Sequence, residues 1–157
     1  MVPAFLIDLS RIDLNRTIYD AAAIEAVNPH RGVMRLLDGV VHTDEQALEA
    51  VAYKDVREDE FWVPGHIPGR PIFPGVLMIE AAAQLASFMA LRMFPDIRFM
   101  GFAGVDAVKF RGQVTPGDRF YVLGKGIDFR RRRFVCAAQG MVNGTMVFEG
   151  KVTGMPL

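Results

Sequence analysis

Cysteine is almost absent from the sequence, since Cys136 is the only one among 157 residues. A single cysteine forms no intramolecular disulfide, which fits a protein of a reducing compartment. The three histidines, His30, His42 and His66, have no spacing typical of a zinc site. The sequence therefore predicts no metal site, and we expect Cys136 to be a buried, unreactive thiol in a strand.

An excess of charge is also missing, because eighteen basic residues balance eighteen acidic ones. Proteins that bind nucleic acids or acidic membranes generally carry a surplus of positive charge. The net charge supports neither class of partner, and we expect no nucleic-acid binding. Apolar residues make up 51% of the chain, which is typical of a globular protein with a substantial core.

The N-terminus, MVPAFLIDLSRID, is not typical of a signal peptide, because it lacks a basic segment and Asp8 interrupts it. The longest apolar segment, Val76–Phe94, contains Glu80, Gln84 and Arg92. Each ionised group at the centre of a bilayer would cost roughly 2.5–3.5 kcal/mol. We interpret this segment as a buried helix and expect a cytoplasmic protein with no membrane insertion.

The order of the predicted elements indicates the fold class. An N-terminal arm, residues 1–27, ends in a short helix, DAAAIEAV, which Asn28-Pro29 terminates. Two short strands, a proline-rich loop over 54–75 and the long helix follow. Strands are expected at 35–41, 47–53, within 98–110, and at 120–129, 134–142 and 145–152. This order predicts a single α+β domain, 1–157, whose antiparallel sheet wraps around the helix.

The segment HIPGRPIFPGVLMIE (His66–Glu80) has a group that can exchange protons at each end. A single histidine in a loop is more often structural or solvated than catalytic. A charged carboxylate is costly among apolar side chains, so burial is expected to raise the pKa of Glu80 and suit it to general-acid catalysis. A structural ion pair with Arg70 or Arg92 is the alternative.

Helical spacing places Glu80, Gln84 and Ser87 in one polar line, which faces either a cavity or partner, or a partly exposed surface. Just before this line, Pro74-Gly75 leaves backbone N–H groups free to bind an oxygen that gains negative charge. A base, an acid and such donors are the groups needed to remove a proton beside a carbonyl and expel a β-hydroxyl.

The segment GHIPGRPIFPGVLMIEAAAQ (Gly65–Gln84) resembles the signature of the (3R)-hydroxyacyl-[acyl-carrier-protein] dehydratases of bacterial fatty-acid synthesis, the FabZ type. NPHR (Asn28–Arg31), FAGVDAVKFRGQVTPGD (Phe102–Asp118) and the closing hairpin match that family in the same order, so the similarity covers roughly residues 24–152. The resemblance implies a hotdog fold and a homodimer, with a trimer of dimers as the assembly. It implies no cofactor, the substrate being carried on the phosphopantetheine of acyl carrier protein.

By position, the resemblance assigns the catalytic histidine to His66 and the catalytic glutamate to Glu80, contributed by different subunits. It assigns the oxyanion-binding amide to Gly75, and the carbonyl that orients the histidine ring to Val76. We interpret His30, which matches the family's PHR motif, as structural.

The sequence departs from the family pattern at GVMRLLD (Gly32–Asp38) and at Ile67, where phenylalanine is usual. These departures remove no catalytic group but point to a changed substrate. Three alternatives remain open: a hotdog acyl-thioester hydrolase, an isomerising FabA-type dehydratase and a non-catalytic acyl-binding paralogue. The first lacks this histidine-to-glutamate spacing, the second usually has aspartate as its acid, and retention of both groups argues against the third.

The densest basic run consists of Arg130, Arg131, Arg132 and Arg133. Acyl carrier proteins are acidic, so the run is a candidate docking site, with Lys109 or Arg111 extending it if the strands pair suitably. The alternative is a solvated turn between two strands.

Overall fold

The computed structural model of the protein describes Met1 and residues 3–157. In this part of the chain the helices are α1 (Ala21–Val27) and α2 (Gly75–Met93), with two 3-10 turns, η1 (Leu9–Arg11) and η2 (Gly32–Met34). The strands are β1 (Tyr19–Asp20), β2 (Gly39–Asp44), β3 (Glu49–Asp55), β4 (Met100–Phe110), β5 (Arg119–Arg130), β6 (Arg133–Val142) and β7 (Thr145–Pro156). They form one antiparallel sheet in the order β1-β2-β3-β5-β6-β7-β4.

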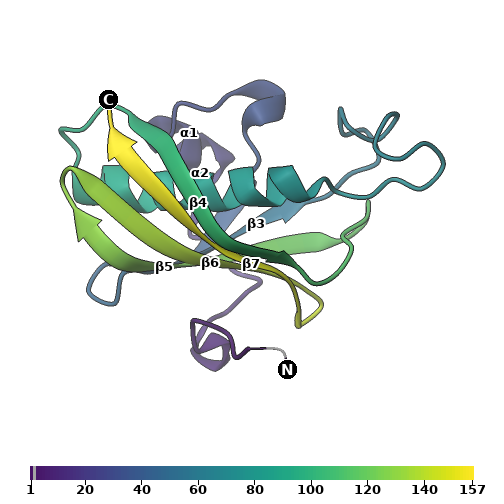
Figure 1. Cartoon of the computed structure of the whole chain (residues 1–157), viewed down its shortest axis with the longest axis horizontal. Coiled ribbons are helices and arrows are strands. Elements are labelled where there is room, and N and C mark those ends of the chain that lie inside the picture. The colour runs from purple at the N-terminus through teal and green to yellow at the C-terminus, as the bar shows by residue number, and fades with distance from the viewer. Residues whose placement is uncertain (2) are drawn as a thin grey trace.

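The sheet curves around α2, which lies along its concave face (Figure 1). Helix α2 begins where the proline-rich loop ends at Pro74, and it ends before Pro95. Ten of its residues are buried, and four of these are alanines that let the helix approach the sheet closely. A Cβ added at Gly124 of β5 would lie only 3.2 Å from the Leu85 side chain. The predicted arrangement of a sheet around one long helix is confirmed.

Aromatic rings fill the space between α2 and the sheet. The fully buried rings are those of Phe73, Phe88, Phe120, Phe134 and Phe148. Deleting one such ring typically costs about 3–5 kcal/mol. Helix α2 is long and apolar enough to cross a membrane, but 56% of its most apolar stretch is buried inside the protein. This packing agrees with the prediction of a buried helix.

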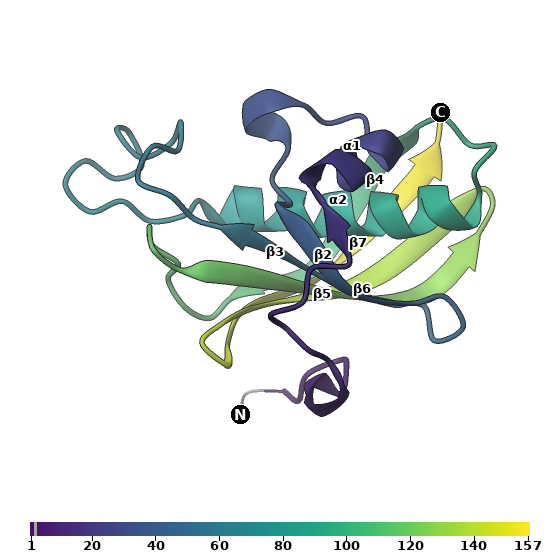
Figure 2. The ribbon, with the colours of Figure 1, turned by 180° about the vertical axis from the view of Figure 1, so that it is seen from behind.

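The first part of the N-terminal arm, residues 3–14, lies on the other, convex face of the sheet, whereas α1 at the end of the arm lies on the α2 side (Figures 1 and 2). Ile7 is buried in a second, smaller core with Val41, Val51, Tyr53, Leu123 and Met141. Gln139 of β6 fixes the arm, because its side chain accepts the N–H of Leu6 at 2.8 Å and donates to the carbonyl of Ala4 at 3.1 Å. Residues 3–14 and α2 therefore cover opposite faces of one sheet.

The predicted strand over 35–41 is wrong at its start, because β2 begins at Gly39. In the residues just before β2, hydrogen bonds made by side chains take the place of strand pairing. Arg35 donates to the Leu37 carbonyl and to Asp38, and Asp38 accepts the backbone N–H of Asp55. These bonds bend the chain into β2.

The C-terminal strand is longer than predicted, because β7 continues to Pro156 through its pairing with β4. The predicted two-residue turn before it is confirmed. Asn143 and Gly144 have φ values of 48° and 75°, as a hairpin turn of this kind requires.

Candidate active site

His66 is oriented by the loop that carries it. Its backbone N–H donates to the Trp62 carbonyl at 2.8 Å, and its ring Nδ1 lies 2.7 Å from the carbonyl oxygen of Ile72. A carbonyl only accepts hydrogen bonds, so Nδ1 carries the proton and Nε2 of the neutral ring keeps a free lone pair. The side chain is exposed. His66 is therefore prepared to act as a base through Nε2.

The carbonyl that orients this ring is that of Ile72, and the assignment to Val76 is corrected. Val76 lies in the first turn of α2, where backbone carbonyls point along the helix, and its side chain is 71% exposed. Ile72 lies in the loop before α2, so its carbonyl does not point along the helix and can bond to the His66 ring.

Gly75 is the first residue of α2, where backbone N–H groups have no partner within the helix. A Cβ at this position would lie 2.7 Å from the Phe110 ring, so only glycine lets the ring pack against the backbone. His66, Gly75, Val76 and Phe110 line one hollow of about 300 Å³. The base and the candidate oxyanion-binding amide are thus brought together.

Glu80 lies one turn further along α2, with 26% of its side chain exposed. Its Oε1 accepts a hydrogen bond from Nε2 of Gln84 at 2.9 Å and lies 3.4 Å from Nε2 of His30. The structural ion pairs considered from the sequence are not formed, because Arg70 donates to Gln113 and Arg92 contacts Glu45. His30 is therefore the titratable neighbour of Glu80.

The pKa of Glu80 is lowered, whereas burial among apolar residues was expected to raise it. Burial is the largest single influence and does push the pKa upward. Hydrogen bonds from His30 and Gln84, together with the electrostatic attraction of His30, outweigh it. Of these donors, Gln84 lies one turn away on the same helix, and the fold brings His30 from a distant part of the sequence.

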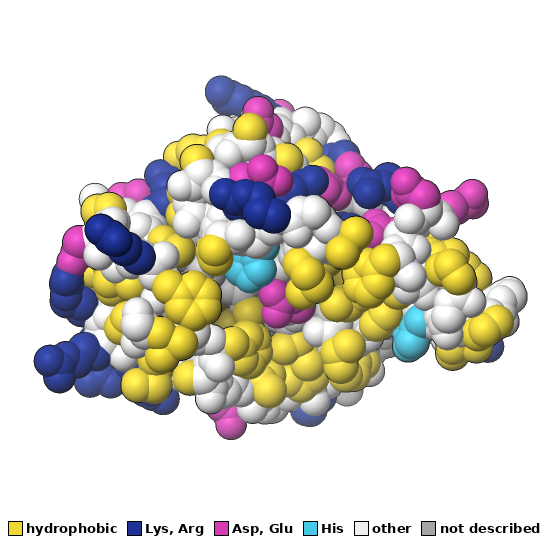
Figure 3. Space-filling model, turned by 90° about the horizontal axis from the view of Figure 1, so that it is seen from above, with side chains coloured by type: hydrophobic (Ala, Val, Ile, Leu, Met, Phe, Trp, Pro, Cys, Tyr) yellow, Lys and Arg dark blue, Asp and Glu magenta, His cyan; other side chains and the backbone are white. Residues whose placement is uncertain are grey.

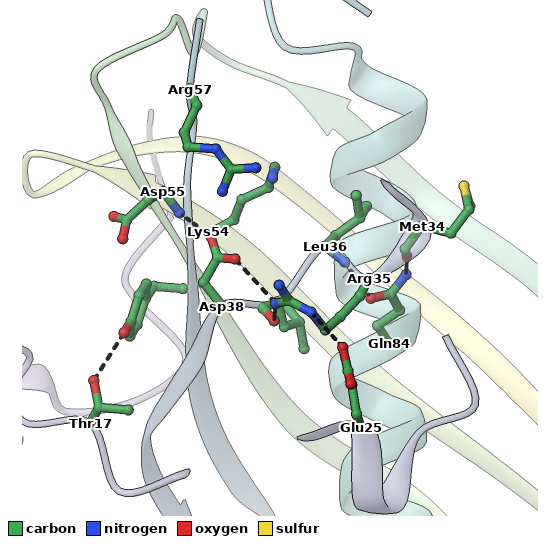
Figure 4. A network of polar contacts seen from close by, with 12 residues as sticks. Thr17, Glu25, Met34, Arg35, Leu36, Asp38, Lys54, Asp55, Arg57 and Gln84 are labelled. Atoms are coloured by element: carbon green, nitrogen blue, oxygen red, sulfur yellow. Dashed lines mark hydrogen bonds and ion pairs between the residues drawn. The ribbon is translucent and has the colours of Figure 1, made fainter. Parts of the chain in front are cut away.

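Gln84 bonds to Glu80 and also to the backbone of Met34 and Leu36, the latter two contacts being drawn in Figure 4. Its Oε1 accepts the N–H of Leu36 at 3.0 Å, and its Nε2 donates to the Met34 carbonyl at 2.7 Å as well as to Glu80. Only an oxygen can accept from the Leu36 N–H, so the orientation of the amide is unambiguous. The side chain is 1% exposed. At Gln84, the polar line on α2 therefore faces another segment of the same chain and not solvent.

The NPHR segment holds His30 against α2. The Asn28 side chain donates to the backbone carbonyl of Gln84 at 2.8 Å. Arg31 donates to the carbonyls of Asn28 and His30, each at 2.8 Å. The segment is therefore fixed on both sides of His30.

Arg35, within the departure at Gly32–Asp38, has a bracing role. It pairs with Glu25 of α1 at 3.0 Å and with Asp38 at 3.2 Å (Figure 4). It is not among the residues that line the hollow beside Glu80. Arg35 therefore fixes the segment after η2 to α1 and to Asp38, just before β2.

His66 and Glu80 line different hollows within one chain. The hollow at Glu80 measures about 120 Å³ and also contains His30. Small residues of α2 form its floor, namely Ala83, Ala86 and Ser87, and its walls include Phe99, Phe102 and Phe134. The base and the acid therefore do not meet in a single site of the isolated chain.

Hydrophobic side chains gather on the side of the molecule opposite the N-terminus, with histidine and acidic side chains among them (Figure 3). Strand β4 is an edge of the sheet, and it exposes Phe102, Val105 and Phe110 by 49%, 41% and 52%. An apolar edge strand is a ready template for pairing with another chain. This edge is the candidate dimer interface.

The arginine run is largely paired within the chain. Arg130 and Arg133 contact Asp128, at 2.7 and 3.3 Å, and Arg131 pairs with Asp96. In the described part of the chain, Arg132 is the member that forms no ion pair. The run precedes Phe134, which lines the hollow beside Glu80.

Lys109 and Arg111 do not extend this run. Both contact Glu149, at 4.0 and 3.0 Å. Glu149 lies near the start of β7, whereas the arginine run adjoins the residue pair Phe134 and Gly154 near its end. The strand pairing therefore separates the two groups of basic residues.

Cys136 is fully buried, as predicted, and burial raises the pKa of its thiol to about 12. A thiol with so high a pKa is rarely ionised and therefore unreactive. Within the described residues, no three His, Cys, Asp or Glu side chains gather as a metal site would require.

Comparison with known proteins identifies the family. The model of the FabA-like domain matches residues 28–151. The 3-hydroxyacyl-[acyl-carrier-protein] dehydratase FabZ of Herpetosiphon aurantiacus is 39% identical over 128 residues, covering 81% of this chain and 90% of that protein. The FabZ of Streptococcus gordonii is 37% identical over 135 residues, covering 85% and 95%.

Solved structures share the fold at low sequence identity. The dehydratase heterocomplex ApeI:P from Xenorhabdus doucetiae superposes with a TM-score of 0.74 at 16% identity, covering 85% of this chain and 90% of that chain. Cj0977, a sigma28-regulated virulence protein from Campylobacter jejuni, gives 0.65 at 14%, covering 89% and 94%. These likenesses support the hotdog fold alone. The family match and the FabZ relatives go further: the chain belongs to the FabZ-type 3-hydroxyacyl-[acyl-carrier-protein] dehydratases of the FabA-like family.

Proposed function

We propose that the protein dehydrates (3R)-3-hydroxyacyl thioesters on acyl carrier protein to trans-2-enoyl thioesters, in fatty-acid or specialised lipid biosynthesis. The observation that carries the proposal is that His66 and Glu80 each keep one atom free to exchange a proton with a substrate. His66 keeps Nε2 free because Ile72 binds Nδ1, and Oε2 of Glu80 has no hydrogen-bond partner among the described residues. The FabZ relatives, which are named for this reaction, support it.

In the proposed reaction, Nε2 of His66 removes a proton from C2 of the substrate. The N–H of Gly75, at the positive end of the α2 dipole, binds the thioester oxygen as negative charge develops on it. Glu80 delivers a proton to the 3-hydroxyl, the C3–O bond breaks, and the C2–C3 double bond forms as water leaves. The proton taken from C2 remains on His66 and Glu80 is left ionised, so exchange with solvent resets both groups.

Glu80 must carry a proton at the moment of transfer, although its pKa is lowered in the isolated chain. Covering its hollow with substrate and a second chain removes water from the carboxyl. Such desolvation raises the pKa of a carboxylic acid. We therefore expect the assembled, substrate-bound site to favour the protonated acid more than the free chain does.

We propose a homodimer in which His66 of one chain and Glu80 of the other form each site, with a trimer of dimers as the full assembly. Two observations support it: the separate hollows of the base and the acid, and the exposed apolar edge of β4. Pairing two β4 edges antiparallel would extend the sheet and carry each His66 towards the partner's Glu80 hollow.

Acyl carrier protein is the proposed macromolecular partner, and the run Arg130–Arg133 is its proposed docking site. The run adjoins Phe134, one of the residues that line the Glu80 hollow, and this proximity supports the proposal. Its pairing with two aspartates leaves an excess of positive charge, because four arginines face Asp96 and Asp128. That excess is suited to an acidic surface.

We further propose a cytoplasmic enzyme that needs no cofactor of its own, since two proton transfers and one oxyanion contact complete the reaction. The thioester is presented on the phosphopantetheine arm of the carrier protein.

An ultraviolet assay of enoyl formation from a series of carrier-bound 3-hydroxyacyl chains tests the function. Absence of turnover at every chain length would contradict the proposal. Release of free thiol would indicate a hydrolase instead, a 3-enoyl product would indicate isomerisation, and acyl binding without turnover would indicate a non-catalytic paralogue.

A further inference from the structure

Two donors converge on one oxygen of Glu80. The Gln84 amide donates to Oε1 at 2.9 Å, and Nε2 of His30 lies 3.4 Å from the same atom. We propose that His30 is a positioning residue for the acid: its Nε2–H and the Gln84 amide together occupy Oε1 and so keep the transferable proton on Oε2. This inference rests on the proposed role of Glu80 as the proton donor.

The amide of Gln84 can act only as a donor towards Glu80. Its oxygen is committed to the Leu36 N–H, and its other amide hydrogen to the Met34 carbonyl. A proton on Oε1 would therefore face the N–H of Gln84, which cannot accept it and has no other acceptor to turn to. The buried amide thus excludes Oε1 as the site of the acidic proton.

His30 acts on the same oxygen from another part of the chain. Its Nδ1 is buried and has no hydrogen-bond partner among the described residues. Nε2 faces a carboxylate oxygen, which accepts a hydrogen bond, so the favoured tautomer of the neutral ring has its proton on Nε2, towards Glu80, and leaves the buried Nδ1 as an acceptor. The distance of 3.4 Å is long for a hydrogen bond, and such contacts commonly shorten when substrate binds.

His30 and Glu80 are the only titratable side chains among the described residues that line this hollow. Segments of β4, β6, β7 and α2 contribute apolar, glycine, serine or threonine residues to it. Oε2, the oxygen left without a partner, is therefore the one available to the substrate hydroxyl. A carboxylic acid with one oxygen fixed and the other free presents its proton in one direction.

Four full-length variants test the inference. His30→Leu removes the donor, and His30→Gln keeps an N–H donor without a titrating ring. Glu80→Gln identifies which carboxyl signal in the NMR spectrum belongs to Glu80. His42→Leu is the matched control, because His42 has a similar exposure, 27% against 26%, and also lies near a carboxylate, that of Glu49. Two readouts are recorded: steady-state kinetics on a carrier-bound 3-hydroxyacyl substrate, and a titration of the ¹³C-labelled Glu80 carboxyl by NMR.

We expect His30→Leu to lower kcat at least about 10-fold with KM within about twofold, the size of effect that misplacing a reacting group produces. The pKa of Glu80 should rise in this variant because a donor to its charged form is lost. His30→Gln should recover most of kcat and of the pKa shift, and His42→Leu should change neither.

Three results would overturn the inference: unchanged kcat and unchanged Glu80 titration in His30→Leu, equal losses in the Leu and Gln variants with no change of titration, or an equal effect of His42→Leu. If His30→Leu does not fold, His30→Asn, whose shorter amide does not reach Oε1, replaces it. The titration also separates the two proposals. A wild-type protein without dehydratase activity would refute the proposed function, whereas the carboxyl titration would still decide whether His30 acts on Glu80.

Discussion

The two halves of the candidate active site are built by opposite means. His66 stands in a loop with an exposed ring, and one carbonyl, that of Ile72, orients it. Glu80 stands on the core helix, where it is bound to Gln84, a side chain that is 1% exposed and tied to the η2 segment. The base half depends on local loop geometry, and the acid half on contacts between residues far apart in the sequence.

This difference separates activity from stability. Changes in the exposed base half should abolish turnover and leave the free energy of unfolding almost unchanged. Changes in the buried acid half should affect both, because the same hydrogen bonds that position the carboxyl also join the 28–36 segment to α2.

The strongest test replaces the two reacting groups. His66→Ala and Glu80→Gln should each lower kcat by at least about 10²-fold, the usual contribution of a positioned base or acid. The double variant should be little worse than the worse single one, because the two groups act as a unit. His66→Ala should change the free energy of unfolding, measured in urea, by no more than about 0.5 kcal/mol. Near-full activity of Glu80→Gln would show that the acid is misassigned.

The second test asks whether the two halves come from different chains. Mixing His66→Ala and Glu80→Gln proteins under conditions of subunit exchange should restore roughly a quarter of wild-type activity, because half of the dimers are mixed and each contains one intact site. Exchange is verified with differently tagged chains. No recovery despite complete exchange would mean that each site is built from one chain.

Gln84→Leu tests the stability of the acid half. The change leaves the buried N–H of Leu36 and the carbonyl of Met34 without their partners, which should cost about 2–4 kcal/mol. Ser87→Ala is the matched control, since Ser87 is 7% exposed on the same helix and forms no side-chain hydrogen bond to the described residues. Urea denaturation measures both, and equal effects would contradict the bracing role of Gln84.

Carrier docking extends the comparison to the surface beside the acid half. Replacing Arg131 and Arg132 by Ser should raise KM for carrier-bound substrate several-fold and leave turnover of a pantetheine substrate unchanged. The effect should diminish near 1 M salt, where the Debye length is about 3 Å. Arg57→Ser is the control, because Arg57 is also an exposed, ion-paired arginine. If the double variant shows the same change, or no change, with both substrates, the arginine run is a solvated turn and not a docking site.

The smallest expected effect is on the pH dependence of stability. Because the folded-state pKa of Glu80 is lowered, its charged form stabilises the fold above the unfolded value of about 4.5, and this contribution is lost as pH falls below it. The difference in unfolding free energy between wild type and Glu80→Gln should therefore narrow between neutral pH and pH values below 4.5. A difference that does not change with pH would argue against the lowered pKa.

The fold was largely predictable from sequence because its signals are local. Proline stops, the Asn143-Gly144 turn and the long, predominantly apolar segment of α2 mark element boundaries that hold in the structure. The start of β2 was not predictable, because Asp38 bonds to the backbone of Asp55, and nothing near Asp38 in the sequence signals that contact.

The motif supplied candidate site residues, whose catalytic roles stay predictions, but it did not supply the electrostatics around them. The motif located His66, Gly75 and Glu80. The direction of the Glu80 pKa shift depends on His30, fifty positions away, which the sequence offered only as part of the PHR motif. The Ile72 carbonyl was also missed, since loop conformation decides which carbonyl meets a ring.

The placement of the chain ends has a practical consequence for attaching the protein to a surface or a fusion partner. The beginning of the N-terminal arm runs over the convex face of the sheet, on the side away from α2 (Figure 1). The backbone N–H of Leu157, by contrast, donates to the carbonyl of Phe99, which lines the hollow beside Glu80. A tether at the N-terminus would therefore leave the approach of a carrier protein open, whereas one at the C-terminus would start at the rim of the acid's hollow.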